Sequence, residues 1–154
     1  MKLLKSFLSL LFCCFCLTQP VIGNCSEKAT RDEAVAMVKK VISDMKTKGI
    51  KQIAQDVNNP QGPYTDRDLY VMIYDMNGKN IAHGANPRMV GKDLLEMRDV
   101  NGVYFIKERI EIAKSKGSGW QDYSFTNPVT KKIEPKSLYI EKSGEFIVTA
   151  GVYK

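Results

Sequence analysis

The sequence predicts an α+β domain built on a five-stranded antiparallel sheet, with helices mostly on one face of it. Hydrophobic residues recur with helical spacing over residues 30–57, and the pattern then changes to strand-like runs. The last three of these runs are joined by turns of hairpin length. Because strands joined by tight turns are antiparallel, and the long helix stands apart from them along the chain, the pattern indicates α+β rather than α/β.

The first helix is expected over residues 30–57. Thr30 and Glu33 have the spacing of a capping box, in which each side chain bonds the backbone of the other. Gly49 interrupts the hydrophobic stripe, so one long helix and two consecutive helices both fit the pattern. Residues 58–63, Asn-Asn-Pro-Gln-Gly-Pro, end the helical segment. The hydrophobic stripe comprises Ala34, Val38, Val41 and Met45.

A hairpin follows this helix. Residues 68–75 have the pattern of a strand that is buried on both faces, or on one face with a pocket on the other, and residues 79–83 form the returning strand. The connecting Asn77-Gly78 is a strong signal for a tight hairpin turn. The remaining expected elements are a short helix over 92–97, a second helix over 103–116, and strands over 120–125, 133–141 and 145–152.

Residues 1–23 have the features of a secretory signal peptide. Lys2 and Lys5 form a basic start, and residues 7–17 are almost all apolar. This run of about 11 residues is shorter than the ~20 that a membrane-spanning helix needs. We expect cleavage near Gly23, which leaves residues 24–154 as one domain that is periplasmic or secreted. Retention of the segment as a membrane anchor is the alternative.

Cysteine and charge composition restrict the mature chain further. Cys25 is the only cysteine after residue 23, so neither an internal disulfide nor a cysteine metal cluster is expected. Asn24 is too polar and too large to precede a lipidated cysteine, and Cys25 is either a frayed terminal thiol or an intermolecular bridge. Removing Lys2 and Lys5 leaves 21 basic against 17 acidic residues, a net charge of +4. These charges are scattered, which argues against a nucleic-acid partner and fits a mild preference for anions.

Lys136 is the candidate for binding the charge of a ligand. It follows Pro135 and shares strand parity with Leu138 and Ile140, so its stem could lie along an apolar surface. An ammonium group in a half-buried pocket can hold a carboxylate by a charge-assisted hydrogen bond. A solvated strand lysine is the alternative interpretation.

Aromatic residues and one histidine complete the candidate site. Tyr123 and Tyr139 could donate hydroxyl hydrogen bonds to the same ligand, and Trp120 could supply a flat wall. Trp120 and Tyr123 differ in strand parity, however, and core packing is the other interpretation of these rings. His83, the only histidine, ends a strand just before a loop and could bond a carboxylate or be a satisfied edge residue. The two further candidates are Tyr74 and Tyr104.

The sequence carries no signature of catalysis, of a metal or of a cofactor. It contains no Gly-x-Ser-x-Gly elbow, no phosphate-binding glycine loop and no second histidine. Residues 75–78 resemble the start of a calcium loop, but the twelfth position is Asn86 instead of the required glutamate. A hairpin turn is therefore the favoured interpretation of this segment, and no metal or cofactor is expected.

An ordered set of short motifs runs through the chain from Leu69 onward. Its members are Tyr74-Asp75 with Asn77-Gly78, Ala82-His83, Gly91-Lys92, Gly119-Trp120 with Tyr123, Asn127-Pro128, Pro135-Lys136 with Tyr139, and Gly151-Val152-Tyr153. In this order they resemble a single Cache domain of type 2, a PAS-like extracytoplasmic sensor domain of bacteria. The resemblance covers residues 30–154. It implies a five-stranded PAS-like sheet, a long N-terminal helix, and a helical segment between the second and third strands.

The resemblance also implies a ligand-binding sensor. The expected ligand is a small organic anion, such as a short carboxylate, held between the sheet and residues 81–104 with Lys136 supplying charge. Most members of this family feed a signalling module, whereas this sequence stops at Lys154, after the last strand. A freestanding exported binder that acts on an envelope receptor or signalling partner is therefore expected. The alternatives are an envelope protein-interaction module that docks through the long helix, and a periplasmic enzyme.

Overall fold

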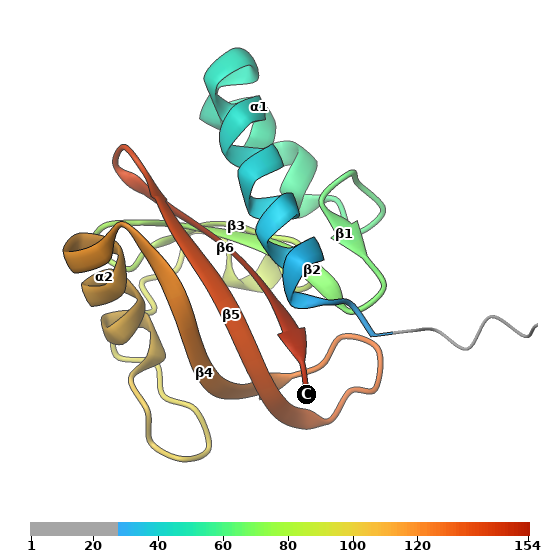
Figure 1. Ribbon diagram of the computed structural model, residues 1–154, viewed down its shortest axis with the longest axis vertical. Helices are drawn as coiled ribbons and strands as arrows, with labels where there is room; N and C mark the ends of the chain where they lie inside the picture. Colours follow the sequence, from blue (N-terminus) through green and yellow to red (C-terminus); the bar gives the residue numbers. More distant parts are fainter. Residues whose placement is uncertain (1–27) are drawn as a thin grey trace, which may run out of the picture.

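The computed structural model describes residues 28–154, which form two helices, one 3₁₀ turn and six strands (Figure 1). The predicted signal peptide and Cys25 lie outside the described residues. No helix within residues 28–154 has the length and apolar character needed to cross a bilayer. The elements are α1 (Arg31–Asn58), β1 (Thr65–Asp66), β2 (Leu69–Asp75), β3 (Asn80–His83), η1 (Pro87–Met89), α2 (Phe105–Lys116), β4 (Ser118–Thr126), β5 (Ile133–Ser143) and β6 (Phe146–Tyr153).

The strands form one antiparallel sheet in the order β1-β2-β6-β5-β4, and β3 also pairs with β2. β1 pairs with the start of β2, and β3 pairs with its second half, so both lie along the same edge. The five predicted strands and the α+β class are confirmed. β1 has only two residues, and the sequence did not predict it.

The two helices cover opposite faces of the sheet, which corrects the expectation that helices lie mostly on one face (Figure 1). α1 packs on the face that contains Val71 and Ile73, whereas α2 packs on the face that contains Met72 and Tyr74. Alternate residues of β2 point to opposite faces, so a strand that is apolar throughout serves two cores. Both cores are built from the described residues.

α1 is bent at one residue near its centre. Gly49 has φ 78° and ψ 157°, a backbone conformation essentially restricted to glycine, and it separates two helical stretches. Of the two possibilities left by the sequence, the structure shows two consecutive helices joined at this kink. The buried residues Val38 and Val41 lie before the kink, and Ile53 and Val57 lie after it. Each stretch therefore contributes separately to the same core.

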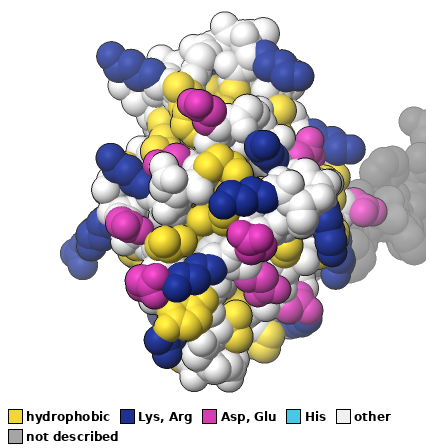
Figure 2. All heavy atoms as spheres, turned by 90° about the vertical axis from the view of Figure 1, so that its left-hand side faces the viewer, with side chains coloured by type: hydrophobic (Ala, Val, Ile, Leu, Met, Phe, Trp, Pro, Cys, Tyr) yellow, Lys and Arg dark blue, Asp and Glu magenta, His cyan; other side chains and the backbone are white. Residues whose placement is uncertain are grey.

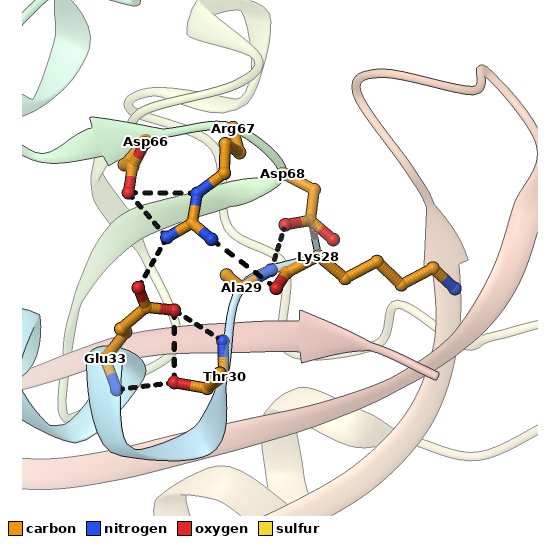
Figure 3. Close-up of polar contacts among 7 residues, drawn as sticks. All are labelled: Lys28, Ala29, Thr30, Glu33, Asp66, Arg67 and Asp68. Atoms are coloured by element: carbon orange, nitrogen blue, oxygen red, sulfur yellow. Dashed lines mark hydrogen bonds and ion pairs between the residues drawn. The ribbon is translucent and has the colours of Figure 1, made fainter. Parts of the chain in front are cut away.

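The start of α1 is anchored to the turn between β1 and β2 (Figure 3). The predicted capping box is present, since Glu33 N donates to Thr30 Oγ1 and Thr30 N donates to Glu33 Oε2. Arg67 donates to Glu33 Oε1 at 2.6 Å and to Asp66 Oδ2 at 2.7 Å. Asp68 Oδ1 accepts from the backbone N of Ala29 at 3.0 Å. These contacts fix the first residues of the domain against an edge of the sheet.

The short helix predicted over residues 92–97 is wrong. This segment runs instead beside the β2–β3 turn, where Leu94 N donates to Gly78 O at 3.1 Å and Asn80 N donates to Lys92 O at 2.9 Å. Its backbone groups therefore bond across to another segment and are not available for a helix. A single 3₁₀ turn forms earlier, at Pro87–Met89.

Candidate functional site

The face of the sheet below α2 carries an unusual concentration of buried polar side chains. Tyr123, Lys136 and Tyr153 lie opposite one another on β4, β5 and β6, since Tyr123 pairs with Lys136 and Lys136 pairs with Tyr153. Directly paired residues point to the same face, so the register alone brings these three side chains together. α2 adds Arg109 from above, and β2 adds Tyr70. The strands and α2 thus converge on one polar cluster inside a hydrophobic core.

Lys136 is completely buried in this cluster. Its Nζ lies 3.8 Å from the ring centroid of Tyr70 and 4.6 Å from that of Tyr153, and its hydrogen bond to Tyr153 Oη is long, at 3.5 Å. Burial, and then the charge of Arg109, lower the pKa of the Lys136 amine well below its usual value, while the carboxylate of Asp68 acts in the opposite direction. Aromatic faces and one phenol hold the amine, but no carboxylate pairs with it among residues 28–154.

Arg109 is the second buried cation, and only 1% of it is exposed. Its Cζ lies 4.8 Å from the ring centroid of Tyr74 and 5.5 Å from that of Tyr123. Nε donates to Gln121 Oε1 at 3.4 Å, whereas both terminal nitrogens are buried and have no hydrogen-bond partner within residues 28–154. Gln121 is itself fixed, because its Nε2 donates to Phe105 O at 2.8 Å. The guanidinium is therefore oriented by its neighbours, and its two terminal nitrogens are available as donors to a ligand.

The phenol of Tyr153 links Lys136 to the end of β4. Tyr153 Oη donates to the carbonyl oxygen of Thr126 at 2.8 Å. Since its proton is used in that bond, its oxygen accepts from Tyr70 Oη at 3.2 Å and from Lys136. The two phenols therefore occupy defined positions around the amine.

His83 is buried at the edge of the same cluster, stacked on Tyr70 with ring centroids 5.4 Å apart. Its Nδ1 accepts from the backbone N of Asn86 at 3.0 Å and of Ala85 at 3.3 Å, so a neutral ring carries its proton on Nε2. Burial, followed by the charges of Lys136 and Arg109, lowers the pKa of His83 to about 3. The ring is therefore neutral at physiological pH.

A cleft of about 360 Å³ opens beside this cluster. Its lining includes Tyr70, His83, Asn86, Met97, Phe125 and Lys131. Tyr70 belongs to both the cluster and the cleft, because its ring faces Lys136 Nζ and the residue also lines the cleft. Tyr70 therefore contacts both the cleft and the buried amine, whereas neither Lys136 nor Arg109 lines the cleft itself.

A larger groove of about 640 Å³ follows the outer surface of α2, between Lys107 and Lys114 and the turn at Met76-Asn77. None of the buried polar residues lines it. On this side of the molecule, acidic and basic side chains alternate over the surface and no histidine is visible (Figure 2). The groove lacks a set of converging unpaired groups, so the buried cluster is the stronger candidate site.

The structure brings together four of the candidates drawn from the sequence, namely Lys136, Tyr123, Tyr74 and His83. It places Tyr104 elsewhere, on the surface, where its hydroxyl accepts from Arg98 and Lys107 Nζ lies 4.4 Å from its ring centroid. Tyr104 therefore covers no part of the cluster.

Trp120 and Tyr139 lie on the opposite face of the sheet, which corrects the expectation that they share a ligand with Lys136. They pack against the core under α1, with ring centroids 5.3 Å apart, and Arg31 Cζ lies 3.8 Å from the Trp120 centroid. Tyr139 Oη donates to Glu141. Residues 136 and 139 differ in strand parity, so a regular strand cannot direct both to one face.

Several residues of the cluster were not among the sequence candidates. Arg109 falls within the apolar stripe of α2, next to Ile110 and three residues after Ile106. A charged residue at a position that the helical pattern assigns to the core could have identified it as a candidate. Tyr70 shares its parity with Tyr74, and Gln121 shares its parity with Tyr123. The remaining member, Tyr153, is placed only by the strand order. Within residues 28–154, no group of histidine, cysteine and carboxylate side chains could hold a metal ion.

A family model described as "Single Cache domain 2" matches residues 25–153. Over 90 residues, 57% of this chain, the sequence is 32% identical to the methyl-accepting chemotaxis protein McpP of Pseudomonas putida. Over 89 residues, 56% of the chain, it is also 32% identical to the sensor histidine kinase MctS of Rhizobium johnstonii. The matched segments cover 16% and 19% of these proteins, so the chain spans less than a fifth of their length.

Solved structures share the fold. A methyl-accepting chemotaxis protein from Vibrio parahaemolyticus superimposes with a TM-score of 0.70 at 22% identity, over 79% of this chain and 86% of that one. A Cache chemosensory domain studied for its recognition of carboxylic acid superimposes with a TM-score of 0.67 at 21% identity, over 79% and 91% of the two chains. Together with the family match over nearly all of residues 28–154, these similarities show that the chain belongs to the single Cache domain 2 family of sensor domains.

Proposed function

We propose that this domain senses a small organic anion, a short carboxylate, which it binds between Lys136 and Arg109 on the α2 face of the sheet. The observation that carries the proposal is the pair of buried cationic side chains without a carboxylate partner among residues 28–154. An unpaired buried charge costs several kcal/mol, and two like charges in one core also repel each other. A bound anion would offset both costs.

A carboxylate matches the unused donors of the cluster. The two terminal nitrogens of Arg109 can bind both carboxylate oxygens, and the Lys136 amine can donate to one of them. Tyr123 and Tyr74 lie against the guanidinium and would limit the length of the rest of the ligand. His83, with its proton on Nε2, offers one further donor beside the cleft. The cleft past Tyr70 is the proposed route of entry.

The relatives support a sensing role over a catalytic one. McpP is named as a chemotaxis protein and MctS as a sensor kinase, and one similar solved domain recognises a carboxylic acid. The basic start and apolar run of residues 1–23 support export to the periplasm or beyond. There the domain would pass its ligand state to an envelope receptor or signalling partner.

A thermal-shift screen of short carboxylates tests this proposal. Acetate, propionate, lactate, pyruvate and succinate would each be added at matched ionic strength, with propionamide as the uncharged control. A ligand present at about 100 times its Kd adds about 2.7 kcal/mol to the free energy of unfolding, which is about 10 °C in Tm for a domain of this size. We expect such a shift with at least one carboxylate and none with the amide. Equal shifts with both, or no shift with any carboxylate, would rule out the proposed ligand class.

A further inference from the structure

The loop that joins β4 to β5, together with the first residue of β5, exposes hydrophobic and basic side chains. Val129 is 56% exposed and Ile133 is 57% exposed, and both belong to the small group of strongly exposed large hydrophobic residues in the described part of the chain. Lys131 and Lys132 lie between them in sequence and are also exposed. Two exposed hydrophobic residues thus flank two exposed lysines within residues 129–133.

Hydrogen bonds to Asn127 hold the backbone of this loop. Asn127 is buried, and its Oδ1 accepts from the backbone N of Val129 at 2.8 Å. Its backbone N donates to Lys132 O at 2.8 Å, and its backbone O accepts from Lys131 N at 2.9 Å. Because the backbone is bonded internally, little conformational entropy would be lost if the loop bound a surface.

Two more lysines lie beside this loop, and the amine of one of them, Lys154, is paired with Asp122 at 2.9 Å. Lys28 Nζ donates to Lys154 O at 2.8 Å, and Lys154 N donates to Pro135 O at 2.9 Å, so both ends of the described chain meet the start of β5. Figure 1 shows the C-terminus, the start of α1 and the β4–β5 loop at one end of the molecule, and in Figure 3 the Lys28 side chain extends away from the polar anchor of α1.

The nearby carboxylates are already engaged within the domain. Glu134 accepts from Thr130 Oγ1 at 2.6 Å and from Asn127 Nδ2 at 2.8 Å. Those hydrogen bonds, and then the charges of Lys28 and Lys132, lower the pKa of Glu134. The surface therefore combines exposed hydrophobic residues with basic groups, unlike the interspersed charges on the α2 side (Figure 2).

We propose that this basic edge, defined by Val129, Lys131, Lys132, Ile133 and Lys28, docks on an anionic phospholipid bilayer. Val129 and Ile133 would enter the headgroup region, and the lysine stems would lie along it with their amines at the phosphates. A protein partner fits less well, because protein interfaces are depleted in lysine and anchored by aromatic residues. Lys131 also lines the 360 Å³ cleft, so a docked bilayer would border the entry to the ligand site. The inference is independent of the ligand.

Vesicle flotation of the chain that remains after the predicted cleavage near Gly23 tests the proposal. We expect binding to vesicles of equal parts phosphatidylglycerol and phosphatidylcholine, and none to pure phosphatidylcholine. Replacing Lys131→Gln together with Lys132→Gln should weaken binding about 30-fold, since each lysine near an anionic surface contributes about fivefold. Val129→Ser with Ile133→Ser should weaken it roughly tenfold or more, because the inserted apolar groups are lost.

Two matched controls test whether the loss of vesicle binding is specific to the β4–β5 loop. Lys114→Gln with Lys116→Gln removes the same charge from the C-terminal turn of α2, at the end of β4 opposite the loop, and should change binding by no more than about twofold. Val100→Ser removes the most exposed valine among the described residues, which lies in another loop, and should have no effect. Equal losses in the controls and the loop variants, retained binding in the loop variants, or no binding to anionic vesicles would each overturn the proposal. Unchanged Tm values in all variants, and unchanged carboxylate shifts in Val129→Ser with Ile133→Ser, whose residues do not line the cleft, separate this result from failure of the ligand site.

Discussion

Replacing Lys136 by methionine should abolish the stabilisation of the domain by carboxylates and leave the domain folded. Truncating one side of a buried, charge-assisted contact costs about 3 kcal/mol, on the order of 100-fold in affinity. The Lys136 side chain is fully buried among aromatic rings, and methionine fills much of the same volume without bringing a charge. Titration calorimetry with the carboxylate that gives the largest thermal shift would measure the loss.

The free energy of unfolding of the ligand-free domain provides a second, independent test of the same substitution. Because the unpaired amine is removed, the ligand-free Lys136→Met variant should be as stable as the wild type or more stable, by about 1–4 kcal/mol. Lys142→Met is the matched control, since it removes an exposed lysine from the same strand. The control should bind like the wild type. Wild-type affinity in Lys136→Met would contradict the proposed site.

The pH dependence of binding has a predictable sign at the same residue. Burial and the charge of Arg109 lower the pKa of Lys136 in the free domain, whereas a carboxylate beside the amine raises it again. Binding is then coupled to uptake of a proton. Affinity should therefore fall as the pH rises through the lowered pKa of the free domain.

Acidification from pH 7 to pH 4 should cost the domain roughly 3 kcal/mol of unfolding free energy through His83 alone. The pKa of His83 is lowered from its ordinary 6.5 to about 3 in the folded state. Between these values the unfolded chain binds the proton and the native state does not, so stability is complete above pH 6.5 and declines as the pH falls. Each pH unit in this window contributes about 1.4 kcal/mol.

His83→Asn is the variant that isolates this contribution, because its Oδ1 can replace Nδ1 as the acceptor for the backbone N of Ala85 and Asn86. Urea unfolding at pH 7 and pH 4 would compare the two proteins. Carboxylates with lowered pKa, such as Asp44 and Asp122, lose stabilisation in acid equally in both. The wild type should therefore lose roughly 3 kcal/mol more than the variant. An equal loss would show that His83 accepts a proton freely in the folded state.

The sequence predicted the regular elements well where the pattern is local. Alternating residues and turn signals located the strands of the sheet, and the capping box at Thr30 located the start of α1. Features that depend on contacts with segments far away in the sequence could not be predicted from local patterns. Residues 92–97 bond to the β2–β3 turn instead of forming a helix, and β1 exists only because it pairs with the start of β2. The placement of α1 and α2 on opposite faces likewise depends on which face of the sheet each helix packs against.

The candidate site was predictable in part for the same reason. The parity of Lys136 with Leu138 and Ile140 correctly indicated a side chain that lies in an apolar environment. Strand parity also places Tyr139 on the face opposite Lys136, so the sequence alone excludes Tyr139 from a site shared with Lys136. Arg109 comes from a helix, so its approach to Gln121 follows only from the packing of α2 on the sheet.

A crystal structure of the domain with the carboxylate that gives the largest thermal shift would test the central claim most directly. The proposal predicts that the carboxylate oxygens lie within hydrogen-bond distance of Lys136 Nζ and of the terminal nitrogens of Arg109, which have no partner within residues 28–154. A ligand bound in the groove along α2, with both cations left without an anion, would contradict it.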